Sequence, residues 1–265
     1  MSLCDHSRVF SARTYEYLSQ VFAYRLGMAE IGITDIFTFQ LVNYYNNTGI
    51  NSARIYKTNW NQESKYGSDI DLFIQRADGK YNRFALQAKV MSFNGAYKDL
   101  KLNSAHNQWD KLLDHENKFN SKSFYLFYNG RPTIRPIRKL PKRPDCLGIP
   151  SIQELGLGIV ETLIVKNIRE TLPNRTGQIY MRHFFPDHMD SIRKLFCCDG
   201  GNFNIDELKG YDFKEIYTGA PYELIKLSEP ELDREEYEIS DQDEEVLFDK
   251  HEDIAPLRIV IDKQE

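Results

Sequence analysis

Acidic, amide and lysine side chains are concentrated in one short stretch of the chain. The stretch contains Glu63, then Asp69 and Asp71, and then Gln87 and Lys89. Mg²⁺ prefers carboxylate and carbonyl oxygens and keeps several of its waters, and Mn²⁺ accepts the same ligands. Three carboxylates and one amide oxygen are therefore a chemically suitable set for holding either cation.

A lysine beside such a site indicates hydrolysis of a phosphodiester bond. That reaction needs a nucleophilic water near neutral pH, neutralisation of charge on the transition state, and stabilisation of the departing oxygen. A divalent cation supplies most of this, and Lys89 adds a positive charge that can orient or deprotonate the water or offset charge on the phosphate. The expected catalytic residues are Asp71, Gln87, Lys89, Asp69 and Glu63, and all of them except Lys89 are expected metal ligands.

A hairpin must position these side chains. Polar and apolar residues alternate in both of its arms, so Asp69 and Asp71 share one face of the first strand, and Gln87 and Lys89 share one face of the second. A three-residue turn with Gly79 in the left-handed conformation would place Asp71 across from Gln87 and Asp69 across from Lys89. A two-residue turn would shift the pairing by one residue and separate these groups.

The elements predicted around the hairpin belong to an α/β core. Apolar periodicity predicts the helices, and turn residues delimit the strands. The expected helices cover residues 14–26, 36–45 and 104–119, and the expected strands cover 53–57, 69–75, 84–90 and 123–128. After residue 130 the expected elements are short helical or mixed segments at 151–155 and 158–169, a helix at 188–196 and a strand at 257–261.

Three short motifs resemble the signature of the PD-(D/E)xK nuclease superfamily. They are Glu63, Gly67-Ser68-Asp69-Ile70-Asp71 and Gln87-Ala88-Lys89, with glutamine where the superfamily more often has an acid. The resemblance implies a restriction-endonuclease-like fold, in which a mixed central sheet flanked by helices is built in the order α-β-β-β-α-β, with a C-terminal α+β extension here. It also implies that Glu30, near the helix before the first strand, is a further metal ligand.

Further matches resemble an uncharacterised bacterial family of restriction-endonuclease-like proteins. The matches are Ala29-Glu30, Ile33-Thr34-Asp35, Gln108 and Tyr125-Leu126-Phe127-Tyr128, and the resemblance spans about residues 29–196. Such families often belong to restriction or anti-phage defence systems. The resemblance therefore implies that the chain is a nuclease effector of a defence system.

The length of 265 residues and the hydrophobic content of 41% allow one α/β core with an appendage. We divide the chain into a nuclease core (1–130), an appended region for substrate or partner contact (131–230) and an acidic tail (231–265). The appended region opens with a basic, proline-containing run that is either a linker or a phosphate-contacting loop. Its cations are Arg131, Arg135, Arg138, Lys139, Lys142 and Arg143.

Several other classes of protein are excluded by the composition. A formal charge of -5 argues against a wholly basic nucleic-acid coat. The chain has neither a membrane-length apolar stretch nor a secretory signal, so we expect a cytoplasmic protein with no membrane association. The cysteines lack zinc-site spacing and are expected to be reduced, and His106 and His115 are expected at the surface.

The favoured function is Mg²⁺-dependent endonucleolytic cleavage of DNA. Cutting both strands needs two active sites, so a homodimer or a protein partner is expected. Two alternatives remain open, because a fold alone does not decide function. One is a non-catalytic module that binds nucleic acid or protein through a degenerate nuclease fold, and the other is an RNA-directed nuclease. A purely structural role is also open for the acidic residues. Asp69 and Asp71 would then be residues that lead into the turn of the hairpin, and Glu63 would be an ordinary exposed side chain.

Overall fold

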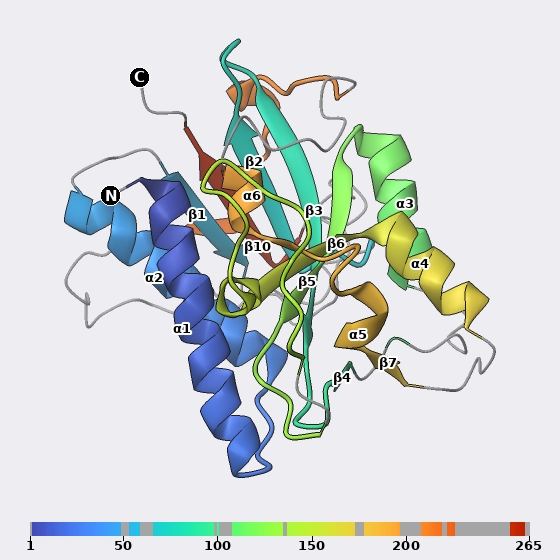
Figure 1. The fold of residues 1–265 in the computed structure, drawn as a ribbon. Coiled ribbons are helices and arrows are strands. Elements are labelled where there is room, and N and C mark those ends of the chain that lie inside the picture. The colour runs from blue at the N-terminus through green and yellow to red at the C-terminus, as the bar shows by residue number, and fades with distance from the viewer. Residues whose placement is uncertain are drawn as a thin grey trace, which may run out of the picture.

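The computed structural model describes residues 2–48, 53–58, 66–97, 100, 108–134, 137–172, 178–196, 208–218, 222–225 and 255–262. In these residues a mixed eight-stranded sheet is flanked by helices on both faces (Figure 1), which confirms the α/β class. Within the same ranges, the structure contains no helix with the length and apolar content needed to cross a membrane.

The helices are α1 (Leu3–Ala23), α2 (Glu30–Thr48), α3 (Gln108–Phe119), α4 (Thr162–Thr171), α5 (Met181–Phe184) and α6 (Arg193–Phe196). The strands are β1 (Ala53–Thr58), β2 (Ile70–Gln75), β3 (Tyr81–Val90), β4 (Ala96–Tyr97), β5 (Lys122–Tyr128), β6 (Leu157–Glu161), β7 (Ile179–Tyr180), β8 (Asp190–Ser191), β9 (Tyr222–Leu224) and β10 (Leu257–Ile261). Two short 3₁₀ helices are η1 (Ile152–Leu155) and η4 (Phe213–Glu215).

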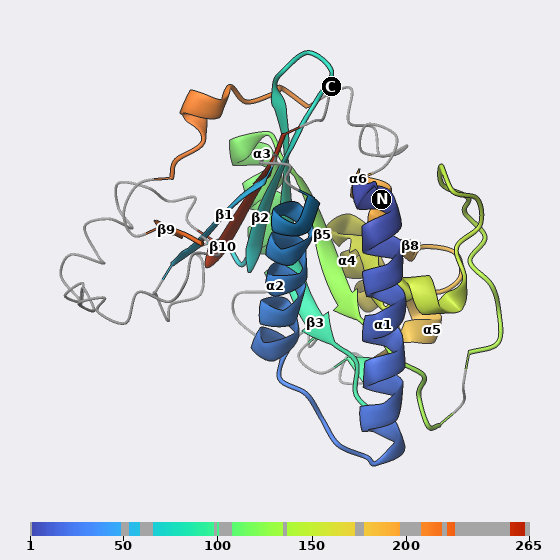
Figure 2. The same ribbon diagram turned by 90° about the vertical axis from the view of Figure 1, so that its left-hand side faces the viewer.

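The large sheet has the strand order β8-β6-β5-β3-β2-β10-β1-β9, and β4 pairs separately with β7. Helices α1 and α2 lie side by side on one face of the large sheet, and α3 and α4 lie on the other (Figures 1 and 2). The main apolar core lies between these helices and the central strands, and includes Phe22, Phe37, Leu72, Leu86, Leu112 and Leu126.

The element types predicted for the first 130 residues are confirmed, with different bounds. Helix α1 begins at Leu3 rather than at residue 14, because the Ser2 side chain accepts a hydrogen bond from the Asp5 amide and caps the helix. Helix α2 begins at Glu30, six residues before the predicted run. Helix α3 begins at Gln108 within the described residues, and the predicted start at residue 104 lies outside them.

The prediction of a helix over 188–196 is wrong. The backbone at Asp190 and Ser191 pairs with β6 as strand β8, and only Arg193–Phe196 is helical. Gly158 permits this close pairing, because a Cβ there would lie 2.7 Å from Met189 Sδ. The mixed segment predicted at 158–169 resolves into the end of β6 and most of α4.

Strand β10 lies in the middle of the sheet although it comes from the end of the chain. It runs antiparallel to β1 and parallel to β2, and its five residues Leu-Arg-Ile-Val-Ile are all buried. The predicted strand at 257–261 is therefore confirmed. Strands β6, β8, β9 and β10 extend the sheet that the first 130 residues begin, so the sequence-based boundary at residue 130 does not correspond to a break in this sheet.

A buried ion-pair cluster joins the three central strands. Oδ2 of Asp71 on β2 lies 2.5 Å from Nη2 of Arg83 on β3 and 2.9 Å from Nη2 of Arg258 on β10, and the three side chains are at most 1% exposed. The guanidinium carbons lie 5.3 Å and 5.5 Å from the ring centroid of Phe73. Burial would raise the pKa of Asp71, but the charges of Arg83 and Arg258 hold that pKa below its ordinary value.

We predict that Asp71→Asn strongly destabilises the fold, because it leaves two buried guanidinium groups without a counter-charge. Removing one partner of a buried pair costs about 3–5 kcal/mol, measurable by urea unfolding at pH 7. The pKa of Asp71 is lowered in the folded state, so its contribution is complete above the unfolded pKa of about 3.9. That contribution is lost as the pH falls from there through the folded pKa.

The matched control is Asp35→Asn, which removes the carboxylate of an exposed pair with Lys57 at 2.8 Å. Exposed pairs contribute little, so this variant should unfold almost as the wild type does. Equal stability of Asp71→Asn and the wild type at pH 7 would show that the cluster does not hold the sheet.

Candidate active site

Asp69 lies directly before β2 and faces β3. Its Oδ2 accepts hydrogen bonds from Gln87 Nε2 at 2.5 Å and from the Ala88 amide at 2.8 Å. Its own amide donates to the carbonyl of Leu86 at 2.9 Å. Both hydrogen bonds to the carboxylate come from the Gln87-Ala88-Lys89 segment, so two of the predicted motifs are in direct contact.

The turn of the hairpin has the predicted form, but the predicted register is wrong. Gly79 has φ +82°, and the Arg76 amide bonds to the Lys80 carbonyl at 2.6 Å, which leaves residues 77–79 as the turn. Asp71 is level with Ala85, and not with Gln87. The shift is two residues, so the alternation of faces is kept while Asp69 takes the place expected for Asp71.

Asp71 is consequently not part of the candidate site. Its Oδ2 is held by the two buried arginines, and Nε2 of His115 on α3 lies 3.7 Å from its Oδ1. A carboxylate neutralised in this way, with no exposed surface, is unsuited to holding a cation for a substrate. The expected surface position of His115 is also wrong, since this side chain is 1% exposed and donates to or accepts from Ser121 Oγ at 2.7 Å.

Lys89 lies near the end of β3, where the first residue of α2 approaches it. Its Nζ lies 3.5 Å from Oε1 of Glu30, and the two side chains are 8% and 29% exposed. The structure thus brings together Asp69, Gln87, Lys89 and Glu30, the last of which only the resemblance had indicated. Glu63, the remaining predicted ligand, lies outside the described residues.

Sequence reasoning did not assign Tyr125 to the site, although this residue is part of the Tyr125-Leu126-Phe127-Tyr128 match. β5 runs parallel to β3 and places Tyr125 level with Gln87, so the two side chains share a face. The Tyr125 hydroxyl is buried and has no hydrogen-bond partner among the described residues. Burial raises its pKa, and the charges of Asp69 and Asp110 raise it further. The sequence did contain a signal, because phenylalanine would fill the same space as Tyr125 without burying a hydroxyl.

The oxygen donors of this cluster are suitable for a hard divalent cation. They are the carboxylates of Asp69 and Glu30, the amide oxygen of Gln87 and the carbonyl of Ala88, which lies 3.4 Å from Gln87 Nε2. Such ligands are those of Mg²⁺ and Mn²⁺, which retain water as well. Gln87 turns its NH₂ toward Asp69, and a half-turn of the amide would present the oxygen instead.

The cluster is sparse in acidic ligands. The part of the chain that the structure describes contains no group of three or more His, Cys, Asp or Glu side chains placed to hold a metal. Two carboxylates, one amide oxygen and one backbone carbonyl are therefore what these residues offer. A cation held there would keep most of its waters, as Mg²⁺ commonly does.

The cluster lies within a region matched by a known family. Residues 3–255 match a family described as "Family of unknown function (DUF6615)", and this range includes Glu30, Asp69, Gln87 and Lys89. No curated protein matches the chain. The match spans nearly the whole sequence, and the chain belongs to this family of unknown function.

Proposed function

We propose that the chain is a metal-dependent nuclease that hydrolyses DNA phosphodiester bonds on a restriction-endonuclease-like core. The observation that carries the proposal is the contact of Asp69 with Gln87 and Ala88, one residue from a lysine that Glu30 restrains. An acid, an amide oxygen, a buried lysine and a second acid at one end of two strands match the needs of phosphodiester hydrolysis.

The order of elements supports the proposed core. Helix α2 is followed by β1, β2 and β3, then by the two-residue β4, α3 and β5. Strands β2 and β3 form an antiparallel hairpin, and β5 lies parallel to β3 after the crossover through α3. Strands β1, β2 and β3 do not form a simple three-strand meander, because β10 lies between β1 and β2.

Each side chain has a role that follows from its contacts. A cation held by Asp69 and the Gln87 oxygen would polarise the phosphate and lower the pKa of a bound water. The Ala88 amide holds the Asp69 carboxylate in one orientation. Lys89 is 8% exposed, so its charge acts in a poorly hydrated environment and can orient the water or offset charge on the phosphate. Glu30 limits the positions of the ammonium group.

DNA as the substrate is supported by part of the basic run after β5. Lys142 pairs with Asp187 at 2.5 Å and Arg143 pairs with Asp190 at 3.2 Å, so these two cations already have carboxylate partners. Besides Lys142, the exposed cations of the run in the described residues are Arg131, Arg138 and Lys139, and Arg135 lies outside those residues. Cations of this kind bind phosphates without regard to sequence. A role in restriction or anti-phage defence rests on the resemblance alone.

One observation favours the alternative of a non-catalytic binding module. The Gln87 NH₂ donates to Asp69, so these two side chains satisfy each other without a cation. Cleavage and metal binding therefore have to be measured separately.

Lys89→Ala is expected to lower metal-dependent DNA cleavage by at least about 100-fold, because a positioned proton donor or acceptor contributes 10²- to 10⁴-fold. The measurement is conversion of supercoiled plasmid with Mg²⁺, with Mn²⁺ and with EDTA. Labelled RNA in a parallel assay tests the other substrate class.

The matched control is Lys80→Ala, which removes an exposed lysine of the same hairpin. This variant should cleave as the wild type does. Cleavage by a folded Lys89→Ala protein at the wild-type rate, or cleavage that survives EDTA, would refute the proposed mechanism.

Gln87→Glu distinguishes a working cation site from a degenerate one. The new carboxylate would lie beside Asp69, where like charges 2.5 Å apart disfavour the folded state unless a cation screens them. We expect a lower melting temperature without Mg²⁺, and a larger Mg²⁺-dependent rise than the wild type shows. Melting curves that do not respond to Mg²⁺ in either protein would favour the binding module.

A further inference from the structure

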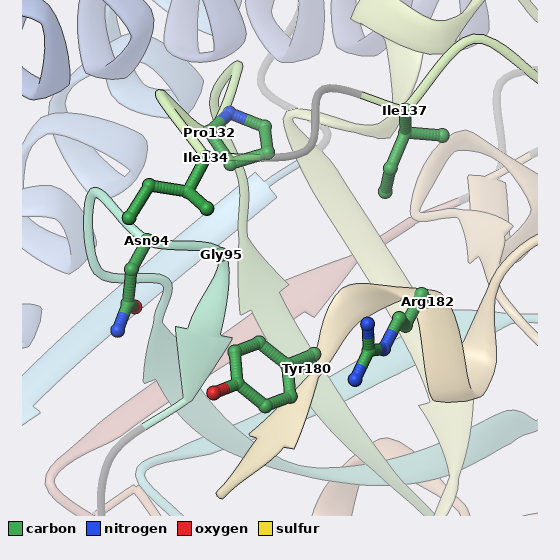
Figure 3. Close-up of a pocket in the computed structure, with 7 residues that line it drawn as sticks. All are labelled: Asn94, Gly95, Pro132, Ile134, Ile137, Tyr180 and Arg182. Carbon is green, nitrogen blue, oxygen red and sulfur yellow. The ribbon is translucent and has the colours of Figure 1, made fainter.

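A small pocket lies next to the turn that joins β3, the strand that carries Gln87 and Lys89, to β4. It is lined by Asn94, Gly95, Pro132, Ile134, Ile137, Tyr180 and Arg182, and its volume is about 260 Å³ (Figure 3). Pockets for drug-sized ligands have about 300–1,000 Å³. The pocket is therefore suited to one planar ring system.

Three segments distant in sequence build this pocket, and backbone hydrogen bonds tie them together. The Met181 amide donates to the Gly95 carbonyl at 3.1 Å, and the Thr133 amide donates to the Phe93 carbonyl at 2.8 Å. Gly95 has φ +83°, and a Cβ there would lie 3.2 Å from Pro132 Cβ. The β4-β7 pair and the loop after β5 thus hold the walls of the pocket in place. The shape of the pocket is therefore set by the backbone of the fold.

The lining combines flat apolar surface with a cation. Pro132, Ile134 and Ile137 lie across from the Tyr180 ring (Figure 3). The guanidinium carbon of Arg182 lies 4.9 Å from the centroid of that ring, and no ion pair to Arg182 occurs within the described residues. A ring that stacks and a cation that binds phosphate are thus presented together. This combination is complementary to a nucleotide.

Asn94 adds a polar group at the pocket edge. Its amide oxygen accepts from Ser92 Oγ at 2.8 Å and from the Ala96 amide at 3.0 Å. These bonds orient the side chain so that its NH₂ is the group available to a ligand. An NH₂ donor suits the carbonyl or ring-nitrogen acceptors that nucleobases carry.

The pocket lies close to the candidate active site along the chain. Lys89 and Asn94 are five residues apart, so their Cα atoms are at most about 18 Å apart. A strand with a phosphate beside Lys89 can therefore reach the pocket with a nucleotide a few positions along the strand. Arg138 and Lys139, exposed and next to Ile137, add positive charge on the same loop.

We propose that this pocket binds the base of one unpaired nucleotide of the substrate strand, with Tyr180 stacking on the base and Arg182 contacting its phosphate. The proposal rests on the proposed function and assigns it a substrate class, namely DNA with an unpaired nucleotide near the cut. Unpaired bases are those that stack on aromatic side chains, whereas bases in a duplex are already stacked on one another.

The test measures binding in a Lys89→Ala background, so that cleavage does not interfere. A labelled single-stranded DNA oligonucleotide is titrated by fluorescence anisotropy against Tyr180→Ala, Tyr180→Phe and Arg182→Gln. Tyr180→Ala should weaken binding about tenfold, because the variant loses the stacking of one base on an aromatic ring. Tyr180→Phe should bind as the parent does, and Arg182→Gln should weaken binding and reduce its salt dependence.

The matched control is Tyr17→Ala, which alters a second pocket of about 200 Å³ between α1 and α2 and should leave binding unchanged. Arg182 is exposed, so Arg182→Gln tests the pocket even if Tyr180→Ala does not fold. Equal affinities of Tyr180→Phe and a folded Tyr180→Ala, or of Arg182→Gln and the parent, would overturn the proposal.

Further measurements distinguish a nucleotide of the substrate strand from a free nucleotide. They also distinguish failure of the pocket proposal from failure of the nuclease proposal. Replacing one base of the oligonucleotide by an abasic position should remove most of the effect of Tyr180→Ala. If AMP alone competes as well as the oligonucleotide does, the pocket serves a free nucleotide and the assignment to the substrate strand is overturned. Tyr180-dependent binding without any cleavage by the wild type would refute the nuclease proposal and leave the pocket as a binding site for an unpaired nucleotide.

Discussion

The ion pair of Asp71 with Arg83 and Arg258 is the constraint on which the central sheet depends. A buried charge must be paired, and these three charges come from β2, β3 and β10. Alternation of polar and apolar residues cannot detect a slip of two residues between strands, because each side chain keeps its face. A slip of two would displace Arg83 from Asp71, so the ion pair selects the register that brings Asp69 to Gln87.

The hairpin was predictable because its determinants are local. Alternation in both arms and the left-handed residue Gly79 predict two strands, a three-residue turn and the shared face of the polar residues. The choice between Asp69 and Asp71 was not predictable in the same way. It depends on Arg258, which is 187 residues from Asp71 in sequence, and no local pattern connects the two. The approach of Glu30 to Lys89 is likewise tertiary, and only the resemblance pointed to it.

The second half of the chain was harder to predict for a related reason. Strand β8 has two residues and exists because its backbone pairs with β6 beside Gly158. The apolar spacing around it favours a helix, and tertiary pairing overrides that preference. β10 is different, since its run of buried apolar residues is typical of a strand covered on both faces. Its type was predictable from composition, and its position between β1 and β2 was not.

A neutral glutamine at position 87, rather than a charged glutamate, suits the charges of the side chains around it. Asp71 is neutralised by arginines, so the described charges of the candidate site are the two carboxylates of Asp69 and Glu30 and the ammonium group of Lys89, and they leave a formal charge of −1. Under the proposed function, one divalent cation would bring this sum to +1, which would attract a phosphodiester. A glutamate at 87 would make the occupied site neutral, with tighter cation binding and weaker attraction for the substrate. Under the proposed function, Gln87 therefore shifts electrostatic attraction from the metal toward the DNA.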